Sequence, residues 1–106
     1  MADLVLVVTL DVRADALDAF RSYESLAARV MTRHGGAIER VVVLRPEPGD
    51  AVHREVHLAR FPSEDAFAAY RSDPELQSAT ALRAQSVLAT TVLTGEDGPD
   101  YHRAGQ

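Results

Sequence analysis

The segment from Phe61 to Leu76 constrains the fold most, because several structural boundaries fall within a short stretch of chain. Pro62 lacks the N–H that a strand ladder needs, so it ends the strand before it. Ser63 is a common helix N-cap, and the two acidic residues after it suit the positive end of a helix. A serine–aspartate pair followed by Pro74 repeats this pattern. The segment therefore predicts a strand end, a helix and the start of a second helix with hardly any linker.

Apolar spacing predicts the remaining elements around this segment. Runs rich in β-branched residues indicate strands, and apolar residues at helical spacing indicate a long helix that ends at a glycine pair, residues 35–36. Asp15 is the expected N-cap of that helix, and Arg21 and Glu24 are expected on its solvent side. The expected strands are 4–10, 37–45, 52–61 and 86–94, the expected loop between the middle strands is 46–50, and a further helical piece is expected at 74–83. The order is βαββαβ.

This order predicts an α+β, ferredoxin-like domain over residues 1–95, followed by a polar tail over 96–106. Two βαβ halves joined by a hairpin give a four-stranded antiparallel sheet with its helices on one face. The strands nevertheless carry apolar residues on both faces, as Leu4 and Leu6 alternate with Val5 and Val7. Because soluble monomers avoid a large bare apolar face, we expect a homodimer formed by sheet-to-sheet packing.

Composition excludes several classes of protein. The chain has no cysteine, which rules out disulfides, thiolate catalysis and zinc sites of the cysteine type. Its net charge is −5 and its 11 basic residues, all arginine, are scattered, so we expect no nucleic-acid partner. No apolar run reaches the roughly 18 residues that span a membrane. We therefore expect a cytoplasmic protein without a membrane partner, and the arginine–alanine bias favours a bacterial source.

Three polar residues alternate along the strand expected at 52–61. His53, Glu55 and His57 share one face of that strand, and neighbouring members lie about 7 Å apart. A histidine beside a glutamate can act as a general acid–base pair in a small-molecule pocket, which makes all three candidate catalytic residues. Two other interpretations stay open: a polar stripe at a strand edge or dimer seam balanced by Arg60 or Arg45, and a metal held by one histidine, the glutamate and a third ligand. Our expectation is no metal and no cofactor.

Five further side chains are candidates on helices. His34 lies in the last turn of the long helix, where a histidine suits the helix dipole, and it is also a candidate catalytic residue. Tyr23, Tyr70 and Phe67 lie on apolar helical faces, where they either pack in the core or line a cavity that binds substrate. Arg83 either holds an anionic ligand or the polar end of its helix.

Four features of the chain together match the pattern of a known family: Arg33-His-Gly-Gly36, the whole segment 61–76, Arg83 and Gly95. By these features the chain resembles the domain-of-unknown-function type numbered 1330, a bacterial branch of the dimeric α/β-barrel superfamily, and more distantly antibiotic-biosynthesis monooxygenases. The resemblance covers about residues 3–96. One position departs from it, because the resemblance implies Trp-Tyr where this chain has Ala69-Tyr70.

The resemblance implies a function as well as a fold. It implies two subunits whose sheets form a barrel with the helices outside, and a small organic molecule as the partner of each subunit. The activity it implies is that of a cofactor-free oxygenase, cyclase or isomerase of a biosynthetic or catabolic pathway. The alternative is a non-catalytic module that binds a small ligand or stabilises a partner, and it predicts a pocket lined only by apolar side chains.

Overall fold

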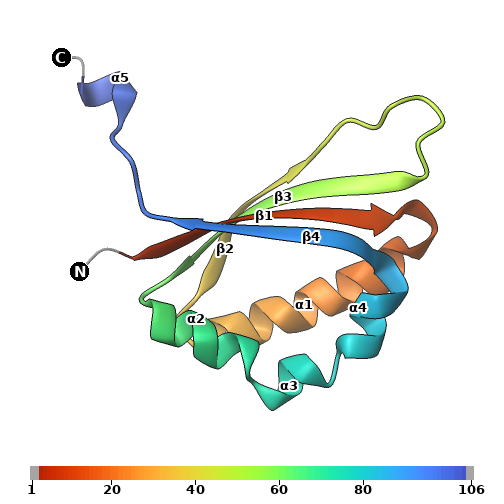
Figure 1. Cartoon of the computed structure of the whole chain (residues 1–106), viewed down its shortest axis with the longest axis horizontal. Helices are drawn as coiled ribbons and strands as arrows, with labels where there is room; N and C mark the ends of the chain where they lie inside the picture. The colour runs from red at the N-terminus through yellow and green to blue at the C-terminus, as the bar shows by residue number, and fades with distance from the viewer. Residues whose placement is uncertain (1–2, 105–106) are drawn as a thin grey trace.

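The computed structural model describes residues 3–104 and confirms the βαββαβ order (Figure 1). A turn of 3-10 helix, η1, precedes the long helix, and a single turn, α5, lies in the tail. Residues 1–2 and 105–106 lie outside the described part of the chain. The elements are β1 (Leu4–Arg13), η1 (Ala14–Ala16), α1 (Leu17–Arg33), β2 (Ala37–Val43), β3 (Val52–Phe61), α2 (Glu64–Arg71), α3 (Pro74–Gln77), α4 (Thr80–Ser86), β4 (Val87–Gly95) and α5 (Tyr101–Ala104).

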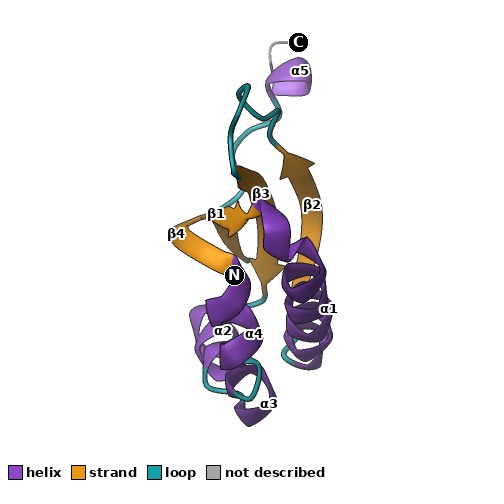
Figure 2. Cartoon of the chain, turned by 90° about the vertical axis from the view of Figure 1, so that its right-hand side faces the viewer, coloured by secondary structure: helices purple, strands orange, loops and turns teal. Residues whose placement is uncertain are grey.

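The four strands form one antiparallel sheet in the order β2-β3-β1-β4. The helices α1 to α4 all lie against one face of this sheet, with α1 on the side of β2, and α2 and α4 on the side of β4 (Figure 2). This arrangement is the ferredoxin-like α+β fold that the sequence predicts. Within residues 3–104, no helix combines the length and the apolar character needed to cross a bilayer.

The helix boundaries in the segment 61–76 follow the predicted capping chemistry. The Ser63 hydroxyl accepts a hydrogen bond from the Ala66 N–H at 3.0 Å, and this bond caps α2. A carboxylate oxygen of Asp73 accepts from the Glu75 N–H at 2.9 Å, with Pro74 at the first position of α3. The predicted helical piece 74–83 is in fact two helices, because α3 ends at Gln77 and α4 begins at Thr80.

The prediction that Asp15 caps the long helix is wrong. The strand β1 continues through Arg13, beyond the turn expected after Leu10, because β3 pairs with it along its whole length. Asp15 then falls in η1, where its carboxylate pairs with the Arg13 guanidinium at 3.2 Å. The residue before α1 is Ala16, which makes no side-chain cap.

The core lies between the sheet and the helices. Alternate residues of β1, namely Leu6, Leu10 and Val12, point toward the helices and are almost fully buried. On the other side of the core, Phe20 of α1 is buried among them. Gly36 allows a close approach of the chain, because a Cβ at that position would lie 2.4 Å from a ring carbon of Phe61. The helix-facing side of the sheet is thus the packed side.

The opposite face of the sheet carries no helix. The register places Val7, Val56 and Leu93 on this face, since they alternate with the buried residues of their strands. Leu93 is 63% exposed and Leu44 is 43% exposed, which are high values for leucine. The chain beyond β4 leaves the sheet on the same side, away from the helices (Figure 1). The bare face is therefore apolar, as the sequence predicts.

Candidate functional site

The polar stripe of β3 faces the helices. The register pairs Glu55 with Leu10 and His57 with Val8 on β1, and residues of this parity point into the packed side of the sheet. Glu55 is 8% exposed and His57 is 5% exposed, so both are buried in a single protomer. His53 has the same orientation and packs near the Phe20 ring, with centroids 6.5 Å apart. The interpretation of these residues as a strand edge or dimer seam is therefore wrong.

Glu55 binds both histidines of the stripe. One carboxylate oxygen lies 2.7 Å from Nε2 of His53, and the other lies 2.8 Å from Nε2 of His57. Neither Arg45 nor Arg60 balances this carboxylate, and Arg60 instead pairs with Asp97 on the other face of the sheet. Burial raises the pKa of Glu55, but the hydrogen bonds from His57 and His53 outweigh burial and lower it overall. Glu55 is thus an ionised carboxylate that fixes two imidazole rings.

Glu24 of α1 extends this arrangement, although we expected it in solvent. Its carboxylate lies 3.7 Å from Nδ1 of His57, on the other side of the ring from Glu55. Burial raises the pKa of Glu24, an effect that nearby His57 only partly opposes. The sequence held a signal for this position, because Glu24 is one turn after Phe20 and three residues before Ala27, and both are buried. We call Glu24, His57, Glu55 and His53 the inner cluster.

One end of the inner cluster opens into a cavity of about 250 Å³ between the sheet and helices α1, α2 and α4. Five of the candidates from the sequence meet there: His57, Tyr23, Tyr70, Phe67 and Arg83. Glu55 and His53 do not line the cavity and lie behind His57. The remaining walls are Leu6, Val8, Leu10, Glu24, Met31, Ile38, Ala59, Arg71, Leu76, Thr90 and Val92. The cavity is therefore largely apolar, with a small set of polar groups.

The polar groups of the cavity come from separate elements. Burial raises the pKa of both Tyr23 and Tyr70, so their phenols stay neutral at ordinary pH. The Arg83 guanidinium donates a hydrogen bond to the Thr90 hydroxyl at 2.7 Å. Sequence reasoning missed Arg71, whose guanidinium carbon lies 4.6 Å from the centre of the Phe67 ring. The spacing of four between Phe67 and Arg71 on α2 was the available signal.

Two residues that the sequence singles out, His34 and Ala69, lie outside the cavity. His34 lies at the end of α1, where its Nε2 is 2.8 Å from an Asp73 carboxylate oxygen, and it does not line the cavity. Arg33 binds the same carboxylate at 3.0 Å. Ala69, where the resemblance implies a tryptophan, is exposed on α2 and is also absent from the lining.

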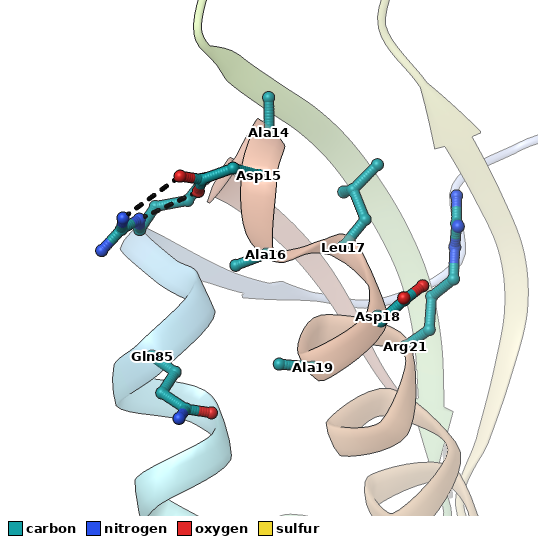
Figure 3. Close-up of a pocket in the computed structure, with 9 residues that line it drawn as sticks. Ala14, Asp15, Ala16, Leu17, Asp18, Ala19, Arg21 and Gln85 are labelled. Atoms are coloured by element: carbon teal, nitrogen blue, oxygen red, sulfur yellow. Dashed lines mark hydrogen bonds and ion pairs between the residues drawn. The ribbon is translucent and has the colours of Figure 1, made fainter.

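A second hollow lies outside the helix layer, beside η1 and the end of α4 (Figure 3). Its lining side chains do not converge, because Asp18 and Arg21 point away from Gln85 (Figure 3). Asp15 is already engaged by the neighbouring arginine of β1. Among residues 3–104, no group of three or more histidines or carboxylates is arranged to hold a metal ion. The cavity beside His57 is thus the better candidate site.

Comparisons with solved structures agree with this fold. A protein of unknown function from Rhodopseudomonas palustris is 19% identical, with a TM-score of 0.73 over 93% of this chain and 85% of that chain. A dimeric protein of unknown function with a ferredoxin-like fold from Bacteroides fragilis is 17% identical, with a TM-score of 0.63 over 92% of this chain and 98% of that chain. SnoaB, a cofactor-independent oxygenase from Streptomyces nogalater, is 23% identical, with a TM-score of 0.60 over 92% of this chain and 97% of that chain.

These identities establish a shared fold and nothing about the reaction. No curated protein matches the sequence. A family model, in contrast, matches residues 6–95, which include all the helices that line the cavity and all four strands except the first two residues of β1. The chain therefore belongs to the family described as the domain of unknown function DUF1330.

Proposed function

We propose that this chain is a small-molecule enzyme whose reaction begins with proton transfer at His57. One observation carries the proposal: His57 stands between two carboxylates, 2.8 Å from Glu55 and 3.7 Å from Glu24, at the wall of a largely apolar cavity. An imidazole held by a buried carboxylate is a common arrangement for a general base. The cavity supplies the second requirement, a largely apolar space in which a small organic molecule can meet that base.

The hydrogen bonds support a role for each member of the inner cluster. The ionised Glu55 accepts the N–H of His57 at Nε2, which leaves the lone pair on Nδ1. Nδ1 is the nitrogen nearer to Glu24, and Glu24 lines the cavity. His57 takes the substrate proton at Nδ1, and Glu55 stabilises the imidazolium that forms. Glu24, whose pKa is raised by burial, is suited to hold a proton and return it to the product.

This step produces an electron-rich carbanion, enolate or phenolate from a carbon acid or a phenol. Such a species can isomerise, cyclise or react with dioxygen, so the proposed base serves an isomerase, a cyclase or a cofactor-free oxygenase of a biosynthetic or catabolic pathway. The proton transfer itself needs only the side chains of the inner cluster. SnoaB is described as a cofactor-independent oxygenase, which supports this class of enzyme. Its likeness to this chain is one of fold only.

The assembly belongs to the same proposal. The bare face of the sheet exposes apolar side chains such as Val42, Leu44 and Leu93 in one protomer. We propose that two copies cover this face by sheet-to-sheet packing around a two-fold axis. The dimeric ferredoxin-like neighbour from Bacteroides fragilis supports this arrangement. The inner cluster lies on the other side of the sheet, so each protomer carries its own site.

The alternative function is a non-catalytic ligand-binding module. It predicts a cavity lined only by apolar side chains, whereas this cavity also holds Glu24, His57 and Arg83. These titratable groups favour the enzyme, because an apolar ligand gains nothing from desolvating them.

Hydrogen exchange at carbon tests the proposal without knowledge of the product. The protein is incubated in D₂O with small 1,3-dicarbonyl compounds and hydroxylated aromatic acids, and deuterium incorporation is followed by NMR. The exchange rate should fall about 100-fold in His57→Gln, which is the lower end of the rate loss expected when a general base is removed. His34→Gln is the matched control and should exchange at the wild-type rate. Exchange that survives in His57→Gln would remove this residue from the mechanism, and an oxygen electrode separates an oxygenase from the other classes.

A further inference from the structure

The cavity contains two arginines, Arg71 and Arg83, that form no ion pair with a carboxylate, although Glu24 of the same cavity lies close enough for Arg83 to oppose the rise in its pKa. Within residues 3–104, neither Arg71 nor Arg83 has a carboxylate oxygen within 4.0 Å of its guanidinium. Both side chains line the cavity, which distinguishes them from the other arginines of the chain. Arg13, Arg29, Arg33, Arg54 and Arg60 all pair with carboxylates. The other arginines without such a pair lie outside the cavity, so they can be neutralised by solvent and salt.

Arg83 is the inner of the two arginines. It is half-buried on α4, and its hydrogen bond to the Thr90 hydroxyl directs it over β4. It also lies close enough to Tyr23 to oppose the rise in the pKa of that phenol, which burial causes. A guanidinium has five N–H donors in a planar fork, and a carboxylate accepts two of them at once. Arg83 therefore keeps donors for a ligand, in a position where water competes less than at the surface.

The register sets the width of the cavity floor between His57 and β4, the strand that Arg83 contacts through Thr90. His57 on β3, Val8 on β1 and Val92 on β4 lie side by side across the sheet. Neighbouring strands are about 4.8 Å apart, so His57 and the β4 backbone are separated by about 10 Å, with Val8 between them. The floor of the cavity is thus apolar in its middle and polar on both sides. This spacing suits a flat molecule with an acidic group at one end.

We propose that the ligand of this cavity is a small organic carboxylate with one or two rings, whose carboxylate binds Arg83 while its ring lies over Val8 beside His57. This inference rests on the proposed function and names its substrate class. Arginine suits a carboxylate better than a neutral amide, because the charged pair forms two parallel hydrogen bonds. A volume of about 250 Å³ lies just below the usual range for drug-sized ligands, which favours one or two rings.

Arg71 lies at the entrance to the same cavity. Phe67, Arg71 and Val92 line the cavity and also a hollow outside it, beside the start of α2. Val92 is 47% exposed although it points to the helix side, so α2 leaves this part of β4 uncovered. The path from solvent therefore passes between α2 and β4. An entering acid meets Arg71 first and Arg83 second, and Arg71 attracts it against the opposing charges of Glu64 and Asp65, which line the same outer hollow.

Equilibrium binding tests this inference with two matched pairs of probes. Benzoate and 2-naphthoate are compared with benzamide and 2-naphthamide, which keep the ring and remove the charge. Calorimetry should show that each acid binds at least tenfold more tightly than its amide. Arg83→Gln should abolish that preference, and Arg71→Gln should mainly slow association. Arg21→Gln is the control, since Arg21 is exposed on α1 and lies outside the cavity.

Several results would overturn the inference. These are amides that bind as tightly as the acids, an unchanged acid preference in Arg83→Gln, or no binding by any of the four probes at millimolar concentration. Arg83→Lys keeps the charge without the fork and should retain part of the preference, which guards against a glutamine variant that fails to fold.

The same variants separate this inference from the proposed function. His57→Gln should still bind the acids, because the carboxylate is held by Arg83. Neutral compounds that bind and exchange deuterium through His57 would contradict the ligand class and leave the proposed function standing. Acids that bind through Arg83, with no exchange in any compound, would contradict the proposed function instead.

Discussion

Two clusters in this molecule pair a histidine with a carboxylate at the same distance, in different surroundings. In the inner cluster, Nε2 of His57 lies 2.8 Å from Glu55 beneath the helix layer. At the end of α1, Nε2 of His34 lies 2.8 Å from Asp73. The side chain of His57 is 6% exposed and that of His34 is 22% exposed. The distance between histidine and carboxylate is the same in both clusters, so it does not distinguish their roles.

What the second cluster does is structural. Asp73 caps α3 through the Glu75 N–H, and it also binds the Arg33 guanidinium at 3.0 Å. Glu75 in turn binds Arg29 of α1 at 3.1 Å. We call Arg29, Arg33, His34, Asp73 and Glu75 the outer cluster, and it joins α1 to α3. The pair in the inner cluster is a candidate for chemistry because it borders a cavity, whereas the pair in the outer cluster fastens two helices together.

The largest effect should follow from Glu55→Ala. The change removes two charge-assisted hydrogen bonds from a buried carboxylate, so the free energy of unfolding should fall by about 2–3 kcal/mol. Deuterium exchange should also be lost, because the rings of His53 and His57 are no longer fixed. Urea unfolding followed by circular dichroism measures the first effect. A variant with wild-type stability would show that the inner cluster holds no net hydrogen-bond energy.

Leu93→Asp should separate the protomers without touching either cluster. A charge on the bare face opposes sheet-to-sheet packing, while Leu93 lies on the side of the sheet away from His57. Sedimentation at micromolar concentration should give twice 11.5 kDa for the wild type and 11.5 kDa for the variant. A wild-type chain that sediments as a monomer would contradict the proposed dimer. Thr9→Ser is a conservative control on the same face.

A smaller effect is expected from Asp73→Ala in the outer cluster. The variant loses the cap of α3 and the partners of Arg33 and His34, so its unfolding midpoint should be lower, by less than in Glu55→Ala. Binding of acids in the cavity should be unchanged. If Asp73→Ala impaired binding while it remained folded, the outer cluster would no longer be purely structural. Ser72→Ala, at a neighbouring exposed position, is the control.

The smallest effect concerns the pH dependence of stability. Burial raises the pKa of Glu24 above its unfolded value, so its contribution to stability is full below about pH 4.3 and is lost as pH rises through its folded pKa. For Asp73, the hydrogen bond from His34 lowers the pKa, so its contribution is present above about pH 3.9 and is lost below it. Glu24→Gln should therefore gain stability relative to the wild type as pH increases from 4 to 8.

Denaturant midpoints measured from about pH 2 to pH 8 provide the test. Asp73→Asn should differ from the wild type in the opposite sense, because its loss is greatest at neutral pH and shrinks as the solution becomes strongly acidic. Parallel profiles for Glu24→Gln and the wild type would show that Glu24 is not desolvated in the folded chain.

Much of the fold can be predicted from the sequence because local sequence signals agree with the tertiary packing. The limits of β3, residues 52–61, follow from the alternation of its side chains and from Pro62 after it. Ser63 marks the start of α2 because its hydroxyl accepts a backbone N–H of the first turn. Pro74 marks the start of α3 because proline has no N–H, and the first helical residue needs none. The cap at Asp15 failed, because pairing of β1 with a distant strand outweighed a local preference.

The candidate site was readable only in part. Alternation shows that His53 and His57 share a face, but the opposite face of β3 carries Val56 and Leu58, so apolar content does not say which face is packed. Glu24 was placed in solvent because of its charge, although its spacing matched the buried stripe of α1. Arg83 of α4 and His57 of β3 line one cavity because elements far apart in sequence pack together, which no local pattern encodes.

The central claim is that His57 presents an unprotonated Nδ1 toward Glu24 and the cavity. Nitrogen-15 NMR of the imidazole rings at pH 8 measures this directly, because the two ring nitrogens differ in chemical shift when one carries the proton. We expect a proton on Nε2, which donates a hydrogen bond to Glu55, and a lone pair on Nδ1. A proton found on Nδ1 would contradict the claim, because the unprotonated nitrogen would then be Nε2, which faces Glu55 and not the cavity.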